Sequence, residues 1–476
     1  MIGIHESDEE KRSFMPYQSV NPATGELLQR FEEYTDDQMM AALAAADTTY
    51  RARWSSASFK ERAKYIGRAA ALMLERKEAL ARLATMEMGK RIAESRGEVE
   101  LSAAILSYYA ANAEQFLAPR RLTSSMGDAH IECSPIGVLI GIQPWNYPYY
   151  QLARFAAPNL MSGNVVLLKH APGVPQCALA FERVLRDAGL PAGAYTNLFL
   201  SNEQVAALID DPRVRGVALT GSEHAGESLA SRAGKNLKKS TMELGGSDAF
   251  IVLPDADLEH TVKMAVVGRF GNNGQTCIGA KRFIVVDAVK DRFLEAFSQA
   301  ASSLKLGDPL DESVTLGPLS SEAALQRLLQ QVRDATANGA RVLLGGDRAG
   351  DKGSFMQPTI LSDITPDNPA FTQEFFGPVA LMFFVKDEDE AVALANNSPF
   401  GLGGSVYTTN IEHGKRVASR IETGMVFINY PSLSAPDLPF GGIKRSGYGK
   451  ELSNLGIEEF INRKLVCVAN GPSLVA

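Results

Sequence analysis

Cys277 is the side chain in this sequence with the most reactive chemistry. It ends a loop, Phe270-Gly-Asn-Asn-Gly-Gln-Thr-Cys277, between a helical pattern and a strand-like run that starts at Arg282. A thiol in such a loop is accessible, and surrounding backbone N–H groups can favour the reactive thiolate. The alternative is a buried cysteine that fills space as a small apolar residue. We assign that structural role to the other three cysteines, Cys133, Cys177 and Cys467.

Two polar residues follow predicted strands and could assist a nucleophile. Glu243 is followed closely by two glycines, which let other groups approach its carboxylate, and this suits a general base. Asn146 lies in an aromatic loop between Pro144 and Pro148, where a fixed amide could stabilise an oxyanion. The alternatives are a solvated glutamate at a strand end and an asparagine that only shapes a turn.

Two further features could bind a phosphate-bearing ligand. The segment Arg215–Gly226 reads as a strand, a Gly/Ser turn and the start of a helix, whose free N–H groups can bind a pyrophosphate. Lys169 ends another predicted strand, and open α/β sheets bind ligands at that edge. A Gly-x-Gly-x-x-Gly fingerprint is absent, so the segment is equally compatible with an ordinary glycine joint. Lys169 could equally be a solvated lysine.

Other catalytic classes have no matching pattern. The six histidines are isolated, and no carboxylate or histidine cluster has metal-ligand spacing, so we expect no metal site. A Ser-His-Asp hydrolase is disfavoured because Gly-x-Ser-x-Gly is missing.

Composition indicates a soluble enzyme. The chain has 476 residues, 45% of them apolar and 22% charged, and a net charge of -7. These values predict two or three globular domains and exclude the basic surface of a nucleic-acid-binding protein. We find no apolar run of the ~20 residues that span a membrane and no secretory signal. Four scattered cysteines suit the reducing cytoplasm, where we expect the protein to act.

The elements that must position these residues alternate between strand and helix. Residues 1–15 read as a loose acidic tail, and residues 36–116 have helical periodicity. Helical stretches such as Pro175–Ala188 and Asp257–Phe270 then separate short, continuous apolar runs, as in parallel sheets covered on both faces. The predicted strands are Gly137–Ile142, Asn164–Leu168, Thr196–Leu200, Gly216–Leu219, Ala249–Leu253, Arg282–Val286, Arg341–Leu344, Ser405–Thr408 and Gly424–Ile428.

Seven motifs occur in one order along the chain. They are Pro144-Trp-Asn-Tyr-Pro148, Leu168-Lys169, Thr220-Gly-Ser222, Met242-Glu-Leu-Gly-Gly246, Gly274-Gln-Thr-Cys277, Glu374-Phe-Phe-Gly-Pro378 and Pro439-Phe-Gly-Gly-Ile-Lys-Arg-Ser-Gly447. This set resembles the NAD(P)-dependent aldehyde dehydrogenase superfamily, most of all its bacterial succinate-semialdehyde dehydrogenases. The resemblance extends from Asn21 to Glu451.

The resemblance implies a catalytic role for three residues. Cys277 would attack the aldehyde to form a thiohemiacetal, and Asn146 with the Cys277 backbone N–H would bind the oxyanion. Hydride would leave to the nicotinamide, and Glu243 would activate water to hydrolyse the thioester. Relatives that pass the acyl group to coenzyme A lack this glutamate, so a free acid is the expected product.

The resemblance also implies cofactor contacts. These would come from Trp145, Lys169, Gly221, Ser222, Gly226, Leu244, Glu374 and Phe376. Three residues after Lys169, many NAD-preferring relatives carry glutamate and many NADP-preferring ones serine, but this chain has Pro172. Since no nearby arginine is evidently placed to hold a 2′-phosphate, we expect use of NAD or NADP with a bias to NAD.

Substrate choice depends on two residues. Arg154 lies eight positions after Asn146 in residues 147–159, which read as a helix, so it would stand ~12 Å along the axis. The resemblance matches it to an arginine that binds the substrate carboxylate, and matches Ser434 to a serine at the substrate mouth. The alternative is an arginine in a helix ion pair. Some relatives carry a second arginine where this chain has Gly271.

The expected fold is α/β, with a Rossmann-like cofactor domain, an α/β catalytic domain and a small antiparallel oligomerisation bridge. Residues 16–122 and 144–244 would form the cofactor domain and 245–438 the catalytic domain. Residues 123–143 and 448–476 would form the bridge and tail, which join a homodimer or homotetramer. The expected reaction is oxidation of succinate semialdehyde to succinate. The alternatives are a dehydrogenase of uncharged medium-chain or aromatic aldehydes and a non-catalytic cofactor-binding protein.

Overall fold

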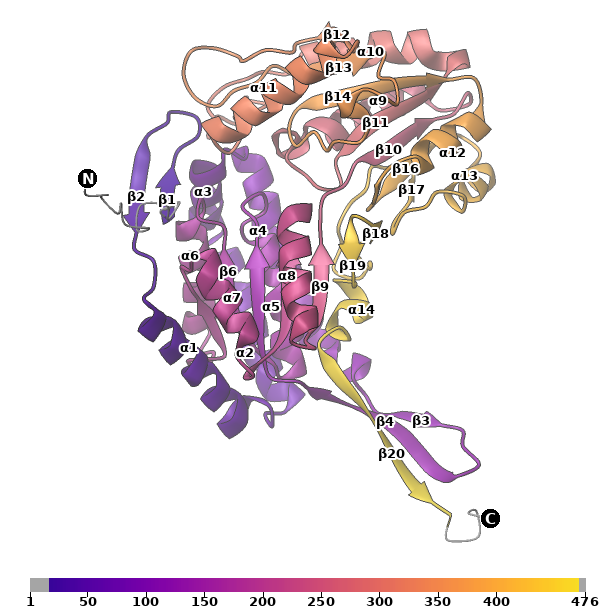
Figure 1. Cartoon of the computed structure of the whole chain (residues 1–476). Helices are drawn as coiled ribbons and strands as arrows, with labels where there is room; N and C mark the ends of the chain where they lie inside the picture. Colours follow the sequence, from indigo (N-terminus) through magenta and orange to yellow (C-terminus); the bar gives the residue numbers. More distant parts are fainter. Residues whose placement is uncertain (1–16, 471–476) are drawn as a thin grey trace, which may run out of the picture.

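The computed structural model describes residues 17–470, so the tail expected at residues 1–15 lies outside the described residues. Two α/β lobes and a projecting antiparallel arm make up the described chain (Figure 1). The α/β class predicted from the sequence is confirmed. Among residues 17–470, no helix combines the length and apolar character needed to cross a bilayer.

The first lobe surrounds a six-stranded sheet in the order β19-β9-β8-β5-β6-β7. Strands β9 to β7 are parallel, and β19 adds an antiparallel edge. Helices cover both faces, so the central strands β5 and β6 are buried almost throughout, which explains their continuous apolar sequences. The bounds are β5 (Val138–Gln143), β6 (Val165–His170), β7 (Tyr195–Asn197), β8 (Val214–Thr220), β9 (Lys239–Glu243) and β19 (Gly447–Tyr448).

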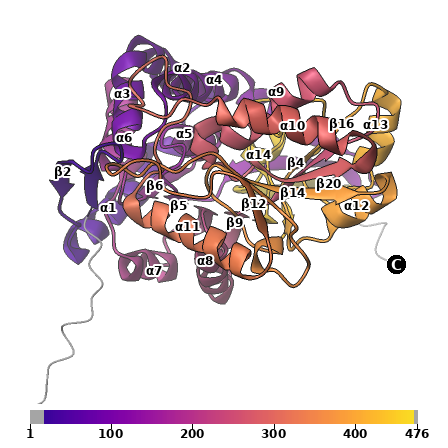
Figure 2. The ribbon, with the colours of Figure 1, turned by 90° about the horizontal axis from the view of Figure 1, so that it is seen from above.

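Helices flank this sheet on two sides, as the view from above shows (Figure 2). One apolar cluster joins the strands to the helices, including Trp54, Tyr109 and Phe155. The helices are α1 (Asp36–Thr49), α2 (Phe59–Glu75), α3 (Lys77–Met88), α4 (Ile92–Phe116), α5 (Tyr150–Ser162), α6 (Pro175–Asp187), α7 (Asn202–Asp210), α8 (Glu223–Lys235) and α14 (Ser453–Ile457), with a π-helical turn at Tyr50–Trp54. A hairpin of β1 (Tyr17–Val20) and β2 (Leu27–Phe31) packs beside them.

The second lobe surrounds a seven-stranded sheet in the order β12-β13-β14-β11-β10-β16-β17. Successive residues of β10 alternate between two apolar clusters, with Phe250 on one face and Ile251 on the other. The strands are β10 (Asp248–Val252), β11 (Ala280–Val286), β12 (Arg341–Leu344), β13 (Thr359–Ser362), β14 (Val379–Val385), β16 (Gly404–Tyr407) and β17 (Phe427–Ile428). The helices are α9 (Leu258–Phe270), α10 (Lys290–Ser302), α11 (Glu322–Ala337), α12 (Glu388–Asn396) and α13 (Ile411–Ala418), with short 3-10 turns at Gly271–Gly274, Asp287–Val289 and Pro369–Phe371.

The arm is a three-stranded antiparallel sheet that projects from the first lobe (Figure 1). Its strands are β3 (Arg120–Leu122), β4 (Gly127–Pro135) and β20 (Ile461–Ala469), and β20 pairs with β4 along its whole length. A two-stranded ladder of β15 (Phe400–Gly401) and β18 (Ile443–Lys444) lies in the second lobe. The two sheets and the arm suit the predicted division into domains, whose boundaries stay a prediction.

The predicted elements differ from the structure in two respects. The strands that were not predicted are β1, β2, β9, β13, β14, β15, β18 and β19, although β14 has the apolar sequence of a buried strand. The helix predicted over residues 147–159 begins only at Tyr150 and ends at Ser162, because residues 144–149 form a turn. The remaining predicted strands and helices are present within a few residues of their expected ends.

Candidate active site

Cys277 lies at the end of a tightly built turn. Asn272 and Asn273 adopt positive φ angles of 53° and 56°, which asparagine tolerates better than most residues. The Asn273 amide donates to the carbonyls of Gly89 and Pro318 at 2.9 Å each, so the turn is tied to other parts of the chain. The two asparagines therefore build the turn that presents the thiol.

The oxyanion candidate is attached to the same turn. The Asn146 Nδ2 donates to the Gln275 carbonyl at 3.0 Å, and the Asn272 Nδ2 donates to the carbonyls of both Asn146 and Gln275 at 3.0 Å. The backbone N–H of Asn272 in turn donates to Glu94 Oε1 at 2.9 Å. The structure thus brings Asn146 beside the Cys277 loop. Asn272 was not singled out from the sequence, although paired asparagines between glycines indicate such a turn.

The surroundings of Cys277 favour the neutral thiol over the thiolate. Burial raises the pKa of Cys277 to about 12, and the positive charges of Arg154 and Lys281 offset burial only in part. The sequence led us to expect backbone donors that favour the thiolate. Desolvation of the charged form outweighs them here, so attack on an aldehyde requires loss of the thiol proton.

Glu243 ends β9 and is buried. Neither of its carboxylate oxygens has a hydrogen-bond partner among the described residues. Burial, and then repulsion from Glu451, raise the pKa of Glu243 well above its ordinary value. A Cβ on Gly441 would lie 2.7 Å from Glu243 Oε1, so glycine there leaves room for the carboxylate. A basic oxygen free of protein partners can take a proton from water.

Arg154 is buried on α5 and forms an ion pair with Glu451. Its two terminal nitrogens donate to the Tyr150 hydroxyl at 3.1 Å and to Thr220 Oγ1 at 3.0 Å. The Tyr150 hydroxyl then donates to Ser434 Oγ at 2.8 Å. Burial opposes the charge of Arg154, but Glu451 keeps its pKa above the usual value, so the guanidinium stays charged. A hydrogen-bonded chain therefore joins Arg154 to Ser434.

One pocket contains both Cys277 and Ser434. It has a volume of about 340 Å³, and Tyr147, Tyr150 and Phe440 also contribute to its wall. Neither Arg154 nor Glu243 is among the described residues that line it. Two glutamates do line it, Glu94 and Glu98, but each is paired with a cation, Arg91 and Lys90 respectively. The pocket wall is thus mainly apolar, with several aromatic rings and a few polar groups, and the charge of Arg154 lies behind it.

The predicted cofactor residues lie mainly at one edge of the first sheet. Trp145 follows β5 and makes an edge contact with Phe376, with ring centroids 5.7 Å apart. Lys169 lies in β6, is half-buried, and forms no ion pair with another described residue. Its closest ring contact is Tyr17, at 5.8 Å. An ammonium without a carboxylate partner at this edge suits the hydroxyl or phosphate oxygens of a nucleotide.

The predicted phosphate turn joins β8 to α8. Ser222 is the N-cap of α8 and accepts from the Ala225 N–H at 3.3 Å, while the Gly221 N–H donates to the Glu243 carbonyl at 3.0 Å. A Cβ on Gly226 would lie 2.7 Å from the side chain of Leu244, so the helix packs closely on that loop. A helix N-terminus with a close-packed glycine fits a dinucleotide pyrophosphate.

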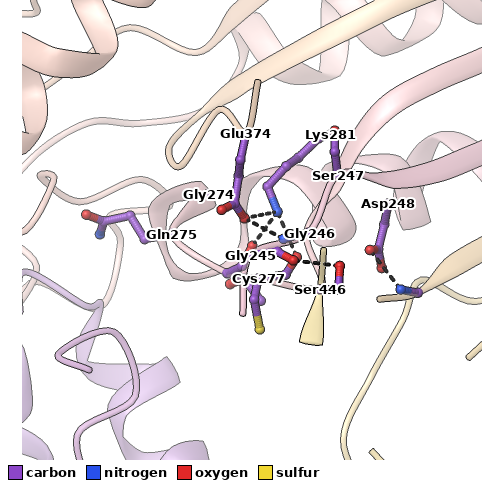
Figure 3. Close-up of polar contacts among 12 residues, drawn as sticks. Gly245, Gly246, Ser247, Asp248, Gly274, Gln275, Cys277, Lys281, Glu374 and Ser446 are labelled. Atoms are coloured by element: carbon purple, nitrogen blue, oxygen red, sulfur yellow. Dashed lines mark hydrogen bonds and ion pairs between the residues drawn. The ribbon is translucent and has the colours of Figure 1, made fainter. Parts of the chain in front are cut away.

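Glu374 reaches from the second lobe to the Cys277 turn (Figure 3). Its Oε1 accepts from the Gly246 N–H at 3.1 Å and pairs with Lys281 Nζ at 3.0 Å. A Cβ on Gly245 would lie 2.4 Å from Glu374 Oε2, so the glycine permits the approach. Lys281 was not identified from the sequence. The signal was two adjacent charges, Lys281 and Arg282, at the start of an otherwise apolar strand.

The described residues, 17–470, contain no group of three or more His, Cys, Asp or Glu side chains placed to hold a metal ion.

Comparison with known proteins places this chain in a family. The sequence model of the aldehyde dehydrogenase family matches residues 9–466. Succinate-semialdehyde dehydrogenase (NADP+) of Deinococcus radiodurans is 52% identical over 451 residues, which cover 95% of this chain and 94% of the relative. A probable succinate-semialdehyde dehydrogenase (NADP+) of Synechocystis sp. is 44% identical over 455 residues, covering 96% of this chain and 100% of that protein.

A solved structure agrees with these sequence relatives. The crystal structure of succinic semialdehyde dehydrogenase from Streptococcus pyogenes, in complex with NADP+ as the cofactor, superposes with a TM-score of 0.94. It is 44% identical in sequence, and the match covers 95% of this chain and 100% of that one. The chain therefore belongs to the aldehyde dehydrogenase family.

Proposed function

We propose that this protein oxidises succinate semialdehyde to succinate with NADP+. The observation that carries the proposal is a series of hydrogen bonds from Arg154 through the Tyr150 hydroxyl to Ser434. Tyr150 and Ser434 line the pocket that also contains Cys277. A short aldehyde with its carbonyl at Cys277 would place its far carboxylate near these hydroxyls. The names of the Deinococcus, Synechocystis and Streptococcus relatives support the same substrate.

The first half of the reaction makes a covalent thiohemiacetal. Cys277 loses its proton to water, and its sulfur adds to the carbonyl carbon of the aldehyde, whose oxygen becomes the oxyanion. The Asn146 amide has two N–H donors, and one is used by the Gln275 carbonyl, so the second is available to the oxyanion. Asn272 binds the carbonyls of both Asn146 and Gln275, so these two residues are held in place and little rearrangement is needed to stabilise the oxyanion.

The second half releases the acid. Bound NADP+ would supply the acceptor for the hydride that leaves the thiohemiacetal carbon, and a thioester would then remain on Cys277. Glu243 then takes a proton from water, whose oxygen attacks the thioester and expels the Cys277 thiolate. The raised pKa of Glu243 makes it a stronger base than an exposed glutamate. Its presence favours hydrolysis over transfer to coenzyme A.

We infer that NADP is the preferred cofactor. Lys169, the α8 N-terminus with Ser222, Gly221 and Gly226, and the Trp145–Phe376 pair would hold it. The expected bias to NAD is not supported, because the relatives named above are described with NADP+. That bias was argued from Pro172, which has no side-chain group for either ribose. Its carbonyl accepts from the Gln18 N–H at 3.1 Å, so the backbone there is tied to β1.

A second candidate, a dehydrogenase of uncharged aldehydes, is favoured by one observation. Arg154 is committed to Glu451 and does not line the pocket, so no described cation lies directly in the pocket wall. Aromatic walls from Tyr147, Tyr150 and Phe440 would accept an apolar chain.

The experiment that separates the two candidates compares kcat/KM for succinate semialdehyde and butanal with NADP+ and with NAD+. The two aldehydes have the same carbon count and differ chiefly in the terminal carboxylate. Our proposal expects a strong preference for the semialdehyde and for NADP+. Equal values for both aldehydes would select the uncharged-aldehyde candidate.

We also propose that the chain self-associates as a homodimer or homotetramer through the arm. Leu465 and Val468 of β20 are largely exposed, with 61% and 66% of their surface accessible, and the outer edge of β20 has no neighbouring strand among the described residues. Such an edge is normally covered in a native assembly.

The free state of all four cysteines suits our proposal of a cytoplasmic location.

A further inference from the structure

A buried ammonium connects the Cys277 turn to Glu374. Lys281 is the second residue of β11, and its side chain is fully buried. Its Nζ donates to the carbonyls of Thr276 and Cys277, each at 2.8 Å, and pairs with Glu374 Oε1 at 3.0 Å. Figure 3 shows these contacts converging on the one nitrogen. An ammonium has three N–H donors, so every donor of Lys281 is used.

The other side of this junction is equally constrained. The Gly246 N–H binds Glu374 Oε1, and a Cβ on Gly246 would lie 2.7 Å from the Cys277 carbonyl oxygen. The Gly245–Gly246 segment therefore packs between the carboxylate and the turn. Displacement of Glu374 or Lys281 would be transmitted directly to the backbone of Cys277.

The neighbouring charges are few. Asp248 is buried and binds the Gly403 N–H and the Ser432 hydroxyl, and burial raises its pKa to about 6. Arg269 donates to the backbone carbonyls of Gly274 and Ala280. Arg282 donates to those of Ser247, Leu394 and Ala395. The remaining charge that affects the thiol is Arg154.

We propose that Lys281 is a positioning residue for the reaction, which fixes the turn carrying Cys277 and couples that turn to Glu374. This inference rests on the proposed role of Cys277 as the nucleophile. It assigns to Lys281 a function that needs no contact with the substrate. Its two carbonyl acceptors belong to the nucleophile and the residue before it, so the ammonium controls where the sulfur is held.

The ion pair also controls the charge experienced by the thiol. Lys281 favours the Cys277 thiolate, whereas Glu374 opposes it. Removal of Lys281 should therefore make the thiol less reactive, and neutralisation of Glu374 should make it more reactive. Opposite effects from the two members of one ion pair are not expected if the pair only stabilises the fold, since either loss would then loosen the same turn.

The test measures the rate of Cys277 alkylation by iodoacetamide as a function of pH, by mass spectrometry of the peptide that contains it. Neither aldehyde nor cofactor is present, so the result does not depend on the substrate. Four proteins are compared: wild type, Lys281→Met, Glu374→Gln and Lys263→Met. The last is a matched control, because Lys263 pairs with Glu259 on the exposed surface of α9.

At a fixed pH below the thiol pKa, Lys281→Met should slow alkylation about tenfold, and Glu374→Gln should speed it by several-fold. The midpoint of the rate–pH profile should move to higher pH in Lys281→Met and to lower pH in Glu374→Gln, and Lys263→Met should match wild type. The proposal is overturned if both active-site variants change the rate in the same direction or neither changes it. If Lys281→Met does not fold, an unchanged rate in Glu374→Gln is sufficient to overturn it.

Failure of this proposal is distinguishable from failure of the proposed function. A Cys277→Ala variant that retains turnover would refute the nucleophile itself, whatever the alkylation rates. Equal use of both aldehydes would refute the substrate and leave the alkylation results unaffected.

Discussion

Arg154→Met is the substitution that most sharply separates a structural arginine from one that selects the substrate. Methionine keeps much of the aliphatic volume and removes the charge. In the structure, the guanidinium is paired with Glu451 and reaches the pocket only through the Tyr150 hydroxyl. Loss of the charge should weaken binding of a substrate carboxylate at that hydroxyl, and should have little effect on an aldehyde without one.

The size of the effect follows from the geometry. The arginine nitrogen lies 3.1 Å from the Tyr150 oxygen. If the Tyr150 hydroxyl turns its proton from Ser434 to a substrate carboxylate, that carboxylate would lie about 6 Å from the charge, given a hydrogen bond of ordinary length. At an effective dielectric constant of about 20, unit charges at that distance interact by roughly 3 kcal/mol, or about 100-fold in kcat/KM. A direct bidentate contact would cost more.

The assay is the ratio of kcat/KM for succinate semialdehyde to that for butanal, from initial rates of reduced-cofactor formation. Removal of one partner of a buried ion pair typically destabilises a protein by about 3–5 kcal/mol, so part of the variant could be unfolded. The ratio is unaffected, because both substrates report on the same folded fraction. Glu451→Gln is the control, since it removes the partner carboxylate and keeps the arginine charge.

The account predicts that Arg154→Met lowers this ratio about 100-fold and that Glu451→Gln preserves it. An unchanged ratio in Arg154→Met would refute the role of the arginine in selection and leave it a structural ion-pair partner. A ratio that falls equally in both variants would assign the effect to a disturbed pocket.

Four further predictions concern other parts of the chain. Glu243→Gln should give a burst of reduced cofactor and then a steady-state rate at least about 100-fold below wild type in rapid-mixing kinetics, and an undiminished steady state would exclude its role in deacylation. Burial lowers the pKa of His170 to about 4, so the unfolded chain binds a proton before the folded one as pH drops. The free energy of unfolding should therefore fall by about 3 kcal/mol between about pH 6.5 and about pH 4. In chemical denaturation, the stability of His170→Gln should depend less steeply on pH than that of wild type, and an identical slope would contradict this. Gly274 has φ +76°, and a Cβ there would lie 2.3 Å from the Gly377 carbonyl. Gly274→Ala should therefore distort the Cys277 turn and lower kcat/KM about 100-fold. An unchanged kcat/KM would show that the turn accommodates the methyl group. Leu465→Glu should shift the assembly towards monomer in light scattering, and an unaltered mass would place the interface elsewhere.

Much of the fold could be predicted from the sequence because buried parallel strands have a plain signature. The continuous apolar runs of β5 and β10 gave their positions to within one or two residues. The turn before α5 was harder, since Pro148 suits both a helix start and a loop. Strand β14 has the same apolar signature, although it was not among the predicted strands.

The site was predictable where local sequence determines the geometry. Cys277 and Asn146 stand in distinctive loops, and the structure brings these loops together. The pairing of Arg154 with Glu451 is different, because it joins residues far apart in the sequence, and neither flanking segment indicates the partner. The preference of Cys277 for the neutral thiol could not be predicted from the sequence either, since it depends on which distant segments pack around the side chain.

The central claim is that succinate semialdehyde is oxidised while attached to Cys277, and the thioester can be observed directly. Glu243→Gln protein would be mixed with succinate semialdehyde and NADP+, quenched in acid and digested, and the mass of the Cys277 peptide measured. The account predicts a succinyl adduct on Cys277 in proportion to the burst of NADPH. A burst without an adduct on Cys277, or with the adduct on another residue, would contradict it.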